Sequence, residues 1–201
     1  MPYRIGLTGN IACGKSTVGR LLVERGAEYI DADTLVHVLM EPGTPEHVRI
    51  AERFGPGVVA ADGRIDRPKL GGIVFADPAA LHDLEAILHP GVRAEIRRRM
   101  RAATAVVVVV DAIKLLESGL AREMDAVWVV TCPRTEQIRR LVADRGLTVE
   151  QAELRIDAQS PQKEKARQAT VVIDNGGTPA HVKQQVAAAL AAIPAGPAGS
   201  S

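Results

Sequence analysis

A glycine-rich motif near the start of the chain constrains the fold more than any other part of the sequence. It runs Gly9-Asn-Ile-Ala-Cys-Gly-Lys-Ser16 and matches G-x-x-x-x-G-K-[ST] at every fixed position. An apolar strand pattern (3–8) precedes it, and an amphipathic helix pattern (about 15–25) follows it. This order places backbone N–H groups around an anion at the positive end of a helix. The alternative is a plain turn, and the flanking patterns favour a phosphate-binding loop.

The residue types inside the loop suggest how a nucleoside triphosphate would be bound. Lys15 is long enough to reach the β- and γ-phosphates, and the hydroxyl of Ser16 is a candidate Mg²⁺ ligand. The candidate ATP-binding residues of this segment are Gly9, Ala12, Cys13, Gly14, Lys15, Ser16 and Thr17.

The chain has two cysteines, Cys13 and Cys132, and no C-x-x-C pair. We therefore expect neither a disulfide framework nor a cysteine zinc site, and we expect a reducing, cytoplasmic compartment. The helix dipole and Lys15 favour a reactive thiolate at Cys13, whereas the alternative is an inert filler of the loop.

Composition and charge exclude several classes of protein. A chain of 201 residues predicts one domain with its own apolar core. Because 25 Lys and Arg residues balance 24 Asp and Glu residues, nothing indicates a nucleic-acid partner. The longest apolar run, 186–193, is far shorter than the roughly 18 residues of a membrane span, and 1–9 predict no signal peptide. We expect no membrane partner, and we expect a monomer.

Apolar runs alternate with helical patterns along the chain, which predicts a three-layer α/β domain with a five-stranded parallel sheet. The expected strands are 3–8, 27–30, 105–110, 126–131 and 170–173. The expected helices are about 15–25, 34–40, 46–54, 78–101, 134–145, 149–159 and 179–192. The Pro/Gly-rich tail, 194–201, is expected to be disordered.

A long segment without convincing strands (about 34–103) interrupts this alternation. It is either a helical crossover or a helical insertion that covers a substrate. We favour the insertion because a crossover needs only about a dozen residues. The expected core is then 1–33, 104–133 and 169–193.

Three carboxylates follow the second and third expected strands. Asp31 and Asp33 are two residues apart and would share a face if the chain is extended there. Asp33 is either a base that orients an attacking hydroxyl or the N-cap of the next helix. Asp111 ends the valine-rich strand, where it is either a Mg²⁺-directed carboxylate or the start of a turn.

An arginine-rich helical hairpin is expected over 134–160. Gly146 is a candidate helix C-cap, and Thr148 with Gln151 forms a capping-box pattern. The arginines of this segment are Arg134, Arg139, Arg140, Arg145 and Arg155. They either form a lid that closes over transferring phosphate or belong to an ordinary solvated face. Asn175-Gly-Gly177 on its own is simply a turn.

Taken together, these segments resemble the dephospho-coenzyme A kinase family. The loop is shared by many NTPases, but the combination in this order is specific. The matching segments are 5–17, Asp31-Ala-Asp33, Val74-Phe75, Leu88-His-Pro90, Asp111 with Leu115-Leu-Glu117, Gln137-Ile-Arg-Arg-Leu141 with Arg145, Arg155-Ile156 with Gln159, and 172–177.

The resemblance implies a P-loop kinase core with a helical substrate subdomain and a mobile lid. It also implies transfer of the γ-phosphoryl group of ATP, with Mg²⁺, to the ribose 3′-hydroxyl of dephospho-coenzyme A. The resemblance implies that Asp33 is the base that orients the 3′-hydroxyl, that Arg140, Arg145 and Arg155 belong to the lid, that Asn175 lies beside adenine and that His89 belongs to the substrate subdomain. With the loop residues included, we expect catalytic roles for Asp33, Lys15 and Arg140, and ATP-binding roles for Arg145 and Asn175. We also expect substrate binding by Thr8, Asp33, His89 and Lys114, and metal binding by Ser16 and Asp111.

The chain departs from the family pattern in two places. Ala12 and Cys13 stand where the family usually has Gly and Ser, and Ile113-Lys114 stands where it usually has Pro-Leu. The first change has a small expected cost, because the loop needs only backbone N–H groups there. Lys114 either adds a phosphate contact or extends into solvent.

Three other functions are alternatives to this interpretation, and two of them still compete with it. Another small-molecule kinase would share everything except the acceptor site, and a non-catalytic nucleotide-binding regulator would share the loop. A GTPase switch is excluded, because neither Asn10 nor Asn175 is followed by the lysine of the guanine-reading N-K-x-D motif.

Overall fold

The computed structural model describes residues 1–194, and 195–201 of the expected disordered tail lie outside the described residues. The strands are β1 (Tyr3–Gly9), β2 (Glu28–Asp31), β3 (Val107–Asp111), β4 (Ala126–Thr131) and β5 (Val171–Asp174). The α-helices are α1 (Lys15–Val23), α2 (Ala32–Leu39), α3 (Pro45–Phe54), α4 (Arg67–Val74), α5 (Pro78–Ala102), α6 (Arg134–Arg145), α7 (Val149–Asp157), α8 (Gln162–Arg167) and α9 (Pro179–Ala191). Two 3₁₀ turns are η1 (Pro56–Val58) and η2 (Leu120–Glu123).

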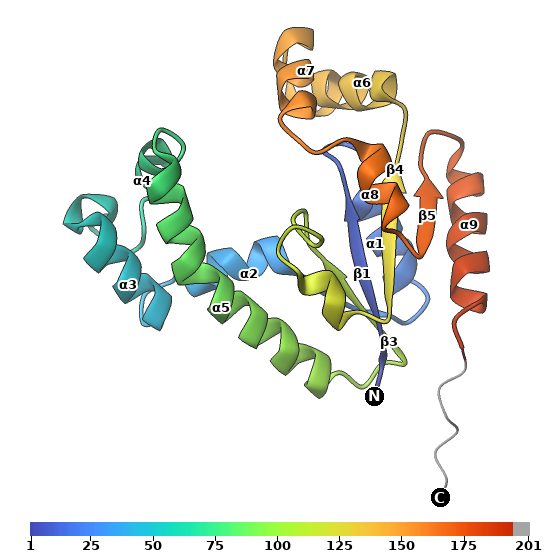
Figure 1. The fold of residues 1–201 in the computed structure, drawn as a ribbon, viewed down its shortest axis with the longest axis horizontal. Coiled ribbons are helices and arrows are strands. Elements are labelled where there is room, and N and C mark those ends of the chain that lie inside the picture. Colours follow the sequence, from blue (N-terminus) through green and yellow to red (C-terminus); the bar gives the residue numbers. More distant parts are fainter. Residues whose placement is uncertain (195–201) are drawn as a thin grey trace, which may run out of the picture. The chain divides into compact units, whose positions relative to one another are not determined.

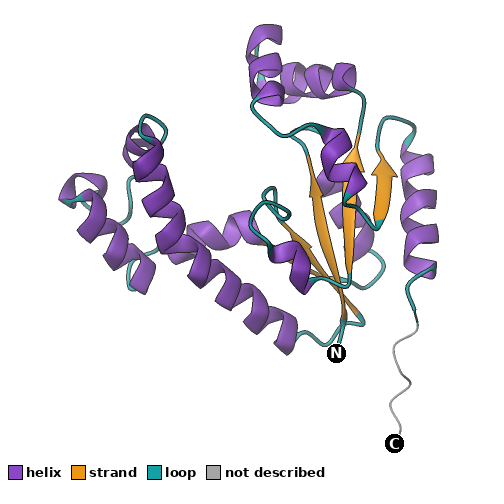
Figure 2. Cartoon of the chain, viewed as in Figure 1, coloured by secondary structure: helices purple, strands orange, loops and turns teal. Residues whose placement is uncertain are grey.

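The strands form one five-stranded sheet in the order β2-β3-β1-β4-β5, drawn as orange arrows in Figure 2. β1 lies at the centre and runs parallel to β3 on one side and β4 on the other, while β5 runs parallel to β4. The predicted parallel α/β fold is confirmed. In such a sheet the crevice at the carboxyl end of the central strand is the usual ligand position. Gly9 of the glycine motif ends β1 at that position.

The apolar residues that pattern the strands pack on both faces of the sheet. On one face, Trp128 and its neighbours form a core with α1 and α9, to which Leu22 and Val186 contribute fully buried side chains. The other face is covered by the β3–β4 connection: a Cβ on Gly6 would collide with Leu115 and Met124. Burial on both faces explains why these strands lack polar alternation.

The chain divides into two compact units, which we call the sheet unit and the helical unit. The sheet unit contains Met1–Ile30 and the chain from Ala103 onward, and the helical unit is Asp31–Ala102. Within the helical unit, α2, α3 and α4 each pack on the long helix α5 (Figure 1). Its core includes Ile50, Leu70 and Leu88.

Two short helices, α4 and α8, are absent from the sequence prediction. The Gly71-Gly72 pair in α4 resembles a loop, and the helix is stabilised by burial of Leu70 and Val74. α8 has the polar sequence Gln162-Lys-Glu-Lys-Ala-Arg167, which carries no apolar periodicity. Tertiary contacts therefore determine whether these two segments are helical, and local sequence patterns do not reveal such contacts.

No helix among residues 1–194 combines the length and apolar character needed to cross a bilayer.

Candidate functional site

The glycine loop joins the carboxyl end of β1 to the first turn of α1. Gly14 precedes the helix with a φ of 87°, in the left-handed region, and no side chain caps the helix start. The first N–H groups of α1 therefore remain for a ligand, and the helix dipole makes this end attractive to an anion.

Close neighbours require glycine at both ends of the loop. A Cβ on Gly9 would lie 2.5 Å from the Val130 carbonyl oxygen, and one on Gly14 would overlap the amide of Asn175. Ala12 has a φ of 58° and is the one non-glycine residue in the left-handed region between residues 1 and 194. This conformation costs an alanine about 1–2 kcal/mol. The expectation of a small cost for Ala12 is therefore wrong, because it considered the N–H groups of the loop and not its backbone dihedral angles.

Two side chains from distant elements bind carbonyl groups of the loop. Arg140 on α6 donates from Nη1 to the Ala12 carbonyl at 3.0 Å and from Nη2 to the Asn175 carbonyl at 2.9 Å. Asn175, directly after β5, donates from Nδ2 to the Cys13 carbonyl at 2.8 Å. The structure thus brings Arg140 and Asn175 to the glycine loop.

Lys15 of the loop, Asp111 and Tyr29 form a polar cluster. Asp111 ends β3, and its Oδ1 lies 4.0 Å from Lys15 Nζ. The Tyr29 hydroxyl donates to Asp111 Oδ2 at 2.5 Å, and the Tyr29 ring lies so close to Gly19 of α1 that a Cβ there would collide with it. No local sequence pattern points to Tyr29, because its role depends on the packing of β2 against α1.

We expect Tyr29→Phe to lower the free energy of unfolding by about 1–3 kcal/mol, because Asp111 would lose a partner for a buried carboxylate oxygen. Urea denaturation would measure the change. Tyr3→Phe is the matched control, since Tyr3 packs on the same core and its hydroxyl makes no hydrogen bond within residues 1–194. Equal losses in the two variants would contradict a specific role for the Tyr29 hydroxyl.

The oxygen donors beside the loop fit a magnesium ion carried by a nucleotide. Ser16 is exposed in the first turn of α1, and Asp111 offers a carboxylate close to Lys15. Residues 1–194 contain no group of three His, Cys, Asp or Glu side chains that could hold a metal by itself. Mg²⁺ at nucleotide sites takes one or two protein oxygens and completes its shell with phosphates and water.

The structure corrects the expectation for the helix start near Asp33. Asp31, not Asp33, is the N-cap of α2, and its carboxylate accepts from the Thr34 N–H at 3.0 Å. The helix begins at Ala32, so Asp31 and Asp33 are not two residues apart on an extended chain, and that expectation is wrong too. The capping interpretation no longer competes with a catalytic role for Asp33, which lies in the first turn of α2.

Thr8 and the turn after β3 are connected through one carbonyl group. The fully buried Thr8 hydroxyl donates to the Ile113 carbonyl at 3.2 Å. The buried Lys165 ammonium donates to the same carbonyl at 3.3 Å and pairs with Glu117 at 3.2 Å. Because these contacts use the backbone of Ile113, the replacement of the family's proline leaves them in place. The side chains of Ile113 and Lys114 are exposed.

The arginines of the helical hairpin separate into two groups. The capping box of Thr148 and Gln151 and the C-cap at Gly146 are confirmed. Arg140 contacts the loop, whereas Arg145 and Arg155 are exposed. The remaining two form surface ion pairs, Arg134 with Asp157 and Arg139 with Glu136, as the solvated-face alternative predicts.

Glu136 on α6 is held between two guanidinium groups. Bonds from Arg139 and Arg140 lower the pKa of Glu136 to about 2. Glu136 therefore stays charged near neutral pH and holds the guanidinium of Arg140, which also reaches Ala12.

The two cysteines, Cys13 of the loop and Cys132 after β4, are free and buried, and they lie close to each other. Cys13 Sγ donates to Gln162 Oε1 at 3.2 Å, and Cys132 Sγ lies 3.5 Å from Cys13 Sγ. The hydrogen bond from Cys132 lowers the pKa of Cys13 and raises that of Cys132. Since the Cys13 side chain is fully buried in the core, its packing favours the filler interpretation.

Of the remaining predicted residues, His89 is half-buried on α5 in the helical unit.

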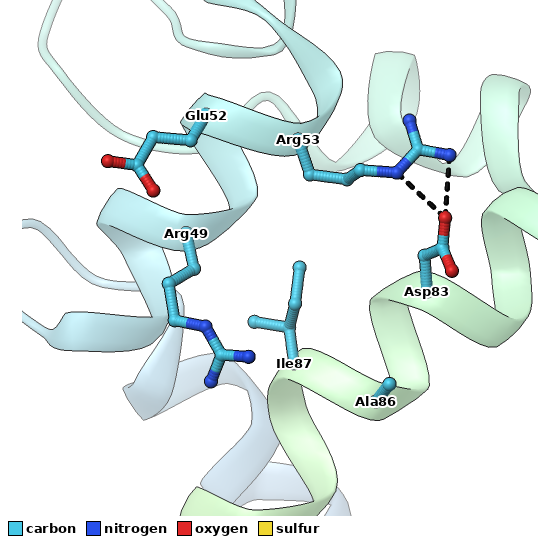
Figure 3. A pocket seen from close by; sticks show the side chains of 6 residues that line it. All are labelled: Arg49, Glu52, Arg53, Asp83, Ala86 and Ile87. Atoms are coloured by element: carbon cyan, nitrogen blue, oxygen red, sulfur yellow. Dashed lines mark hydrogen bonds and ion pairs between the residues drawn. The ribbon is translucent and has the colours of Figure 1, made fainter.

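The helical unit has a surface hollow of about 450 Å³ between α3 and α5, lined by Arg49, Glu52, Arg53 and Asp83 among others (Figure 3). Arg53 is paired with Asp83 at 2.6 Å, so the four charges balance. This hollow therefore lacks the net positive charge expected of a phosphate site.

Comparison with known proteins extends the geometric description. A model of the dephospho-CoA kinase family matches residues 3–180. The dephospho-CoA kinase of Symbiobacterium thermophilum is 51% identical over 198 residues, which cover 97% of this chain and 83% of that protein. The solved structure of TT1252 from Thermus thermophilus is similar with a TM-score of 0.84 and 34% identity, covering 96% of this chain and 99% of that one. A dephospho-CoA kinase from Campylobacter jejuni gives a TM-score of 0.71 and 28% identity, covering 95% and 96%. The chain belongs to the dephospho-CoA kinase family.

Proposed function

We propose that this chain transfers the γ-phosphoryl group of ATP to the ribose 3′-hydroxyl of dephospho-coenzyme A, giving coenzyme A and ADP. This reaction is the last step of coenzyme A biosynthesis. The family match carries the identity of the acceptor, because it spans residues 3–180 and so includes the helical unit as well as the glycine loop.

The loop is proposed to bind the ATP phosphates. Its N–H groups and the uncapped start of α1 supply fixed positive dipoles, and Lys15 adds a charge. Arg140 lies on the loop and adds a second charge as phosphate is transferred. Phosphoryl transfer has a loose transition state, so positioning and charge account for most of the acceleration.

Ser16 and Asp111 are the residues we propose for the magnesium ion that accompanies ATP. When bound, the ion neutralises charge on the phosphate oxygens. Tyr29 would hold the Asp111 carboxylate in position through Oδ2, while Lys15 lies near Oδ1.

Asp33 is proposed as the base of the reaction. As the 3′-hydroxyl oxygen forms its bond to the γ-phosphorus and the bond to the β–γ bridging oxygen breaks, the hydroxyl proton passes to the Asp33 carboxylate. The support is the family resemblance at Asp31-Ala-Asp33, together with the finding that Asp31 serves as the cap.

The remaining residues are proposed to enclose the substrates. His89 and Lys114 would contact the acceptor, and Thr8 would support the turn that carries Lys114. Arg145 and Arg155 are exposed on the hairpin and would contact ATP when this lid closes. A closed lid keeps water from acting as the acceptor.

An ATP-consumption assay with a panel of acceptors tests the proposal. We expect turnover with dephospho-coenzyme A and only background rates with adenosine monophosphate, thymidine monophosphate and shikimate. Preference for another acceptor would identify a different small-molecule kinase. Nucleotide binding without turnover on any acceptor would indicate a regulator.

A further inference from the structure

The backbone of Ile11, inside the glycine loop, is held at both of its polar atoms by glutamine side chains. Gln159, between α7 and α8, accepts from the Ile11 N–H at 2.7 Å. Gln137 on α6 donates from Nε2 to the Ile11 carbonyl at 2.7 Å. Because a backbone N–H only donates and a carbonyl only accepts, the orientation of both side-chain amides is fixed.

Two further contacts join the same part of the loop to the hairpin. The Ile11 side chain packs against the small apolar cluster of Leu141, Ala152 and Ile156, which holds α6 and α7 together. Asn10 Nδ2 donates to the Ser160 carbonyl at 2.9 Å. The first two variable residues of the loop are therefore attached to the hairpin by polar and apolar contacts.

These bonds determine where neighbouring N–H groups point. A trans peptide is planar, with its C=O and N–H on opposite sides. When Gln137 holds the Ile11 carbonyl, the Ala12 N–H of the same peptide is turned the opposite way. Asn175 acts likewise through the Cys13 carbonyl on the N–H of Gly14. The direction of these loop N–H groups is thus set by side chains from outside the loop.

The burial of Gln137 supports a specific role. Its side chain lies in α6 with 1% of the residue exposed, and it is among the largest fully buried side chains of the chain. A helix position that only had to fill space would accommodate an aliphatic residue without the cost of burying an amide. Here the amide binds the carbonyl of Ile11, and Arg140 and Asn175 bind the next two carbonyls of the loop, those of Ala12 and Cys13.

We propose that Gln137 and Gln159 are positioning residues for the nucleotide phosphates. They act through Ile11, and they couple the docking of the α6–α7 hairpin to the shape of the phosphate loop. This inference rests on the proposed function only in taking a nucleoside triphosphate as the ligand of the loop.

Direct nucleotide binding tests the proposal with Gln137→Met and Gln159→Met in the full-length chain. Methionine matches glutamine in length but neither donates nor accepts as an amide does. We expect each variant to raise the Kd of a non-hydrolysable ATP analogue, measured by calorimetry, roughly tenfold. In turnover assays the KM for ATP rises similarly, while the KM for the acceptor stays within about twofold.

Gln151→Met is the matched control, because Gln151 stabilises the start of α7 through the capping box without touching the loop. We expect it to lower the melting temperature and to leave the Kd within about twofold. An equal rise in Kd in this control would overturn the proposal, since hairpin stability alone would then explain the effect.

The double variant distinguishes a shared target from two separate effects. Because both glutamines act on Ile11, we expect its Kd to rise much less than the product of the two single effects. Unchanged Kd in both single variants, with lowered melting temperatures, would overturn the proposal. If Gln137→Met does not fold, the test rests on Gln159→Met. Gln159 is only half-buried, so its replacement is expected to leave the fold intact. Calorimetry needs no acceptor, so a failure of the proposed reaction would leave this result in place.

Discussion

Lys15→Ala is expected to reduce phosphoryl transfer by roughly 10³-fold or more while the fold stays intact. Lys15 is the charged side chain of the loop, and 16% of it is exposed. Its loss removes a charge that stabilises the transferring phosphoryl group. The fold should survive, because Asp111 keeps its hydrogen bond from Tyr29 at 2.5 Å.

Steady-state turnover measures the first part of this prediction, and thermal denaturation followed by circular dichroism measures the second. Lys163→Ala is the matched control, since Lys163 is exposed on α8. We expect that variant to retain turnover. Near-normal activity of Lys15→Ala would contradict the role assigned to the loop.

Asp33→Asn is expected to lower kcat by roughly 10²–10⁴-fold with little change in the KM of the acceptor. An amide has nearly the same shape as the carboxylate, so acceptor binding is retained. It cannot accept the hydroxyl proton, so the chemical step is slowed. A loss of tenfold or less would show that Asp33 is not the base.

The neighbouring Asp31 provides a control that differs only in position. Asp31 caps α2, and asparagine caps a helix about as well as aspartate. Asp31→Asn should therefore retain turnover and stability. A comparable fall in kcat for Asp31→Asn would indicate that charge near the start of α2, and not a base at position 33, is what the reaction needs.

The sequence predicts the sheet and the loop because both depend on local patterns. Long apolar runs identify β3 and β4, and the glycine motif has a strand and a helix on its two sides. The sequence offers Asp33 as a candidate helix cap, but the structure places the cap at Asp31, because Asp31 and Asp33 are equally suited to capping. Only the point where the chain becomes helical, at Ala32, decides between them.

The residues that support the loop lie beyond what local patterns can predict. Gln137 and Gln159 stand among the matching segments, but an amide on a helix carries no signal of its partner. Ile11 is 126 residues from one and 148 from the other. Tyr29 likewise acquires its role only when β2 and β3 become neighbours in the sheet.

The single tryptophan of the chain, Trp128, is 1% exposed in the middle of β4. Tryptophan fluorescence therefore reports solvent entry into the sheet unit. It does not report unfolding of the helical unit, because the aromatic residues of that unit are Phe54 and Phe75 and it contains no tryptophan. In contrast, helices α2–α5 of the helical unit contribute a large part of the far-ultraviolet circular dichroism signal. Superimposable denaturant curves from the two probes would mean that both units unfold as one cooperative block, and separated curves would assign a midpoint to each.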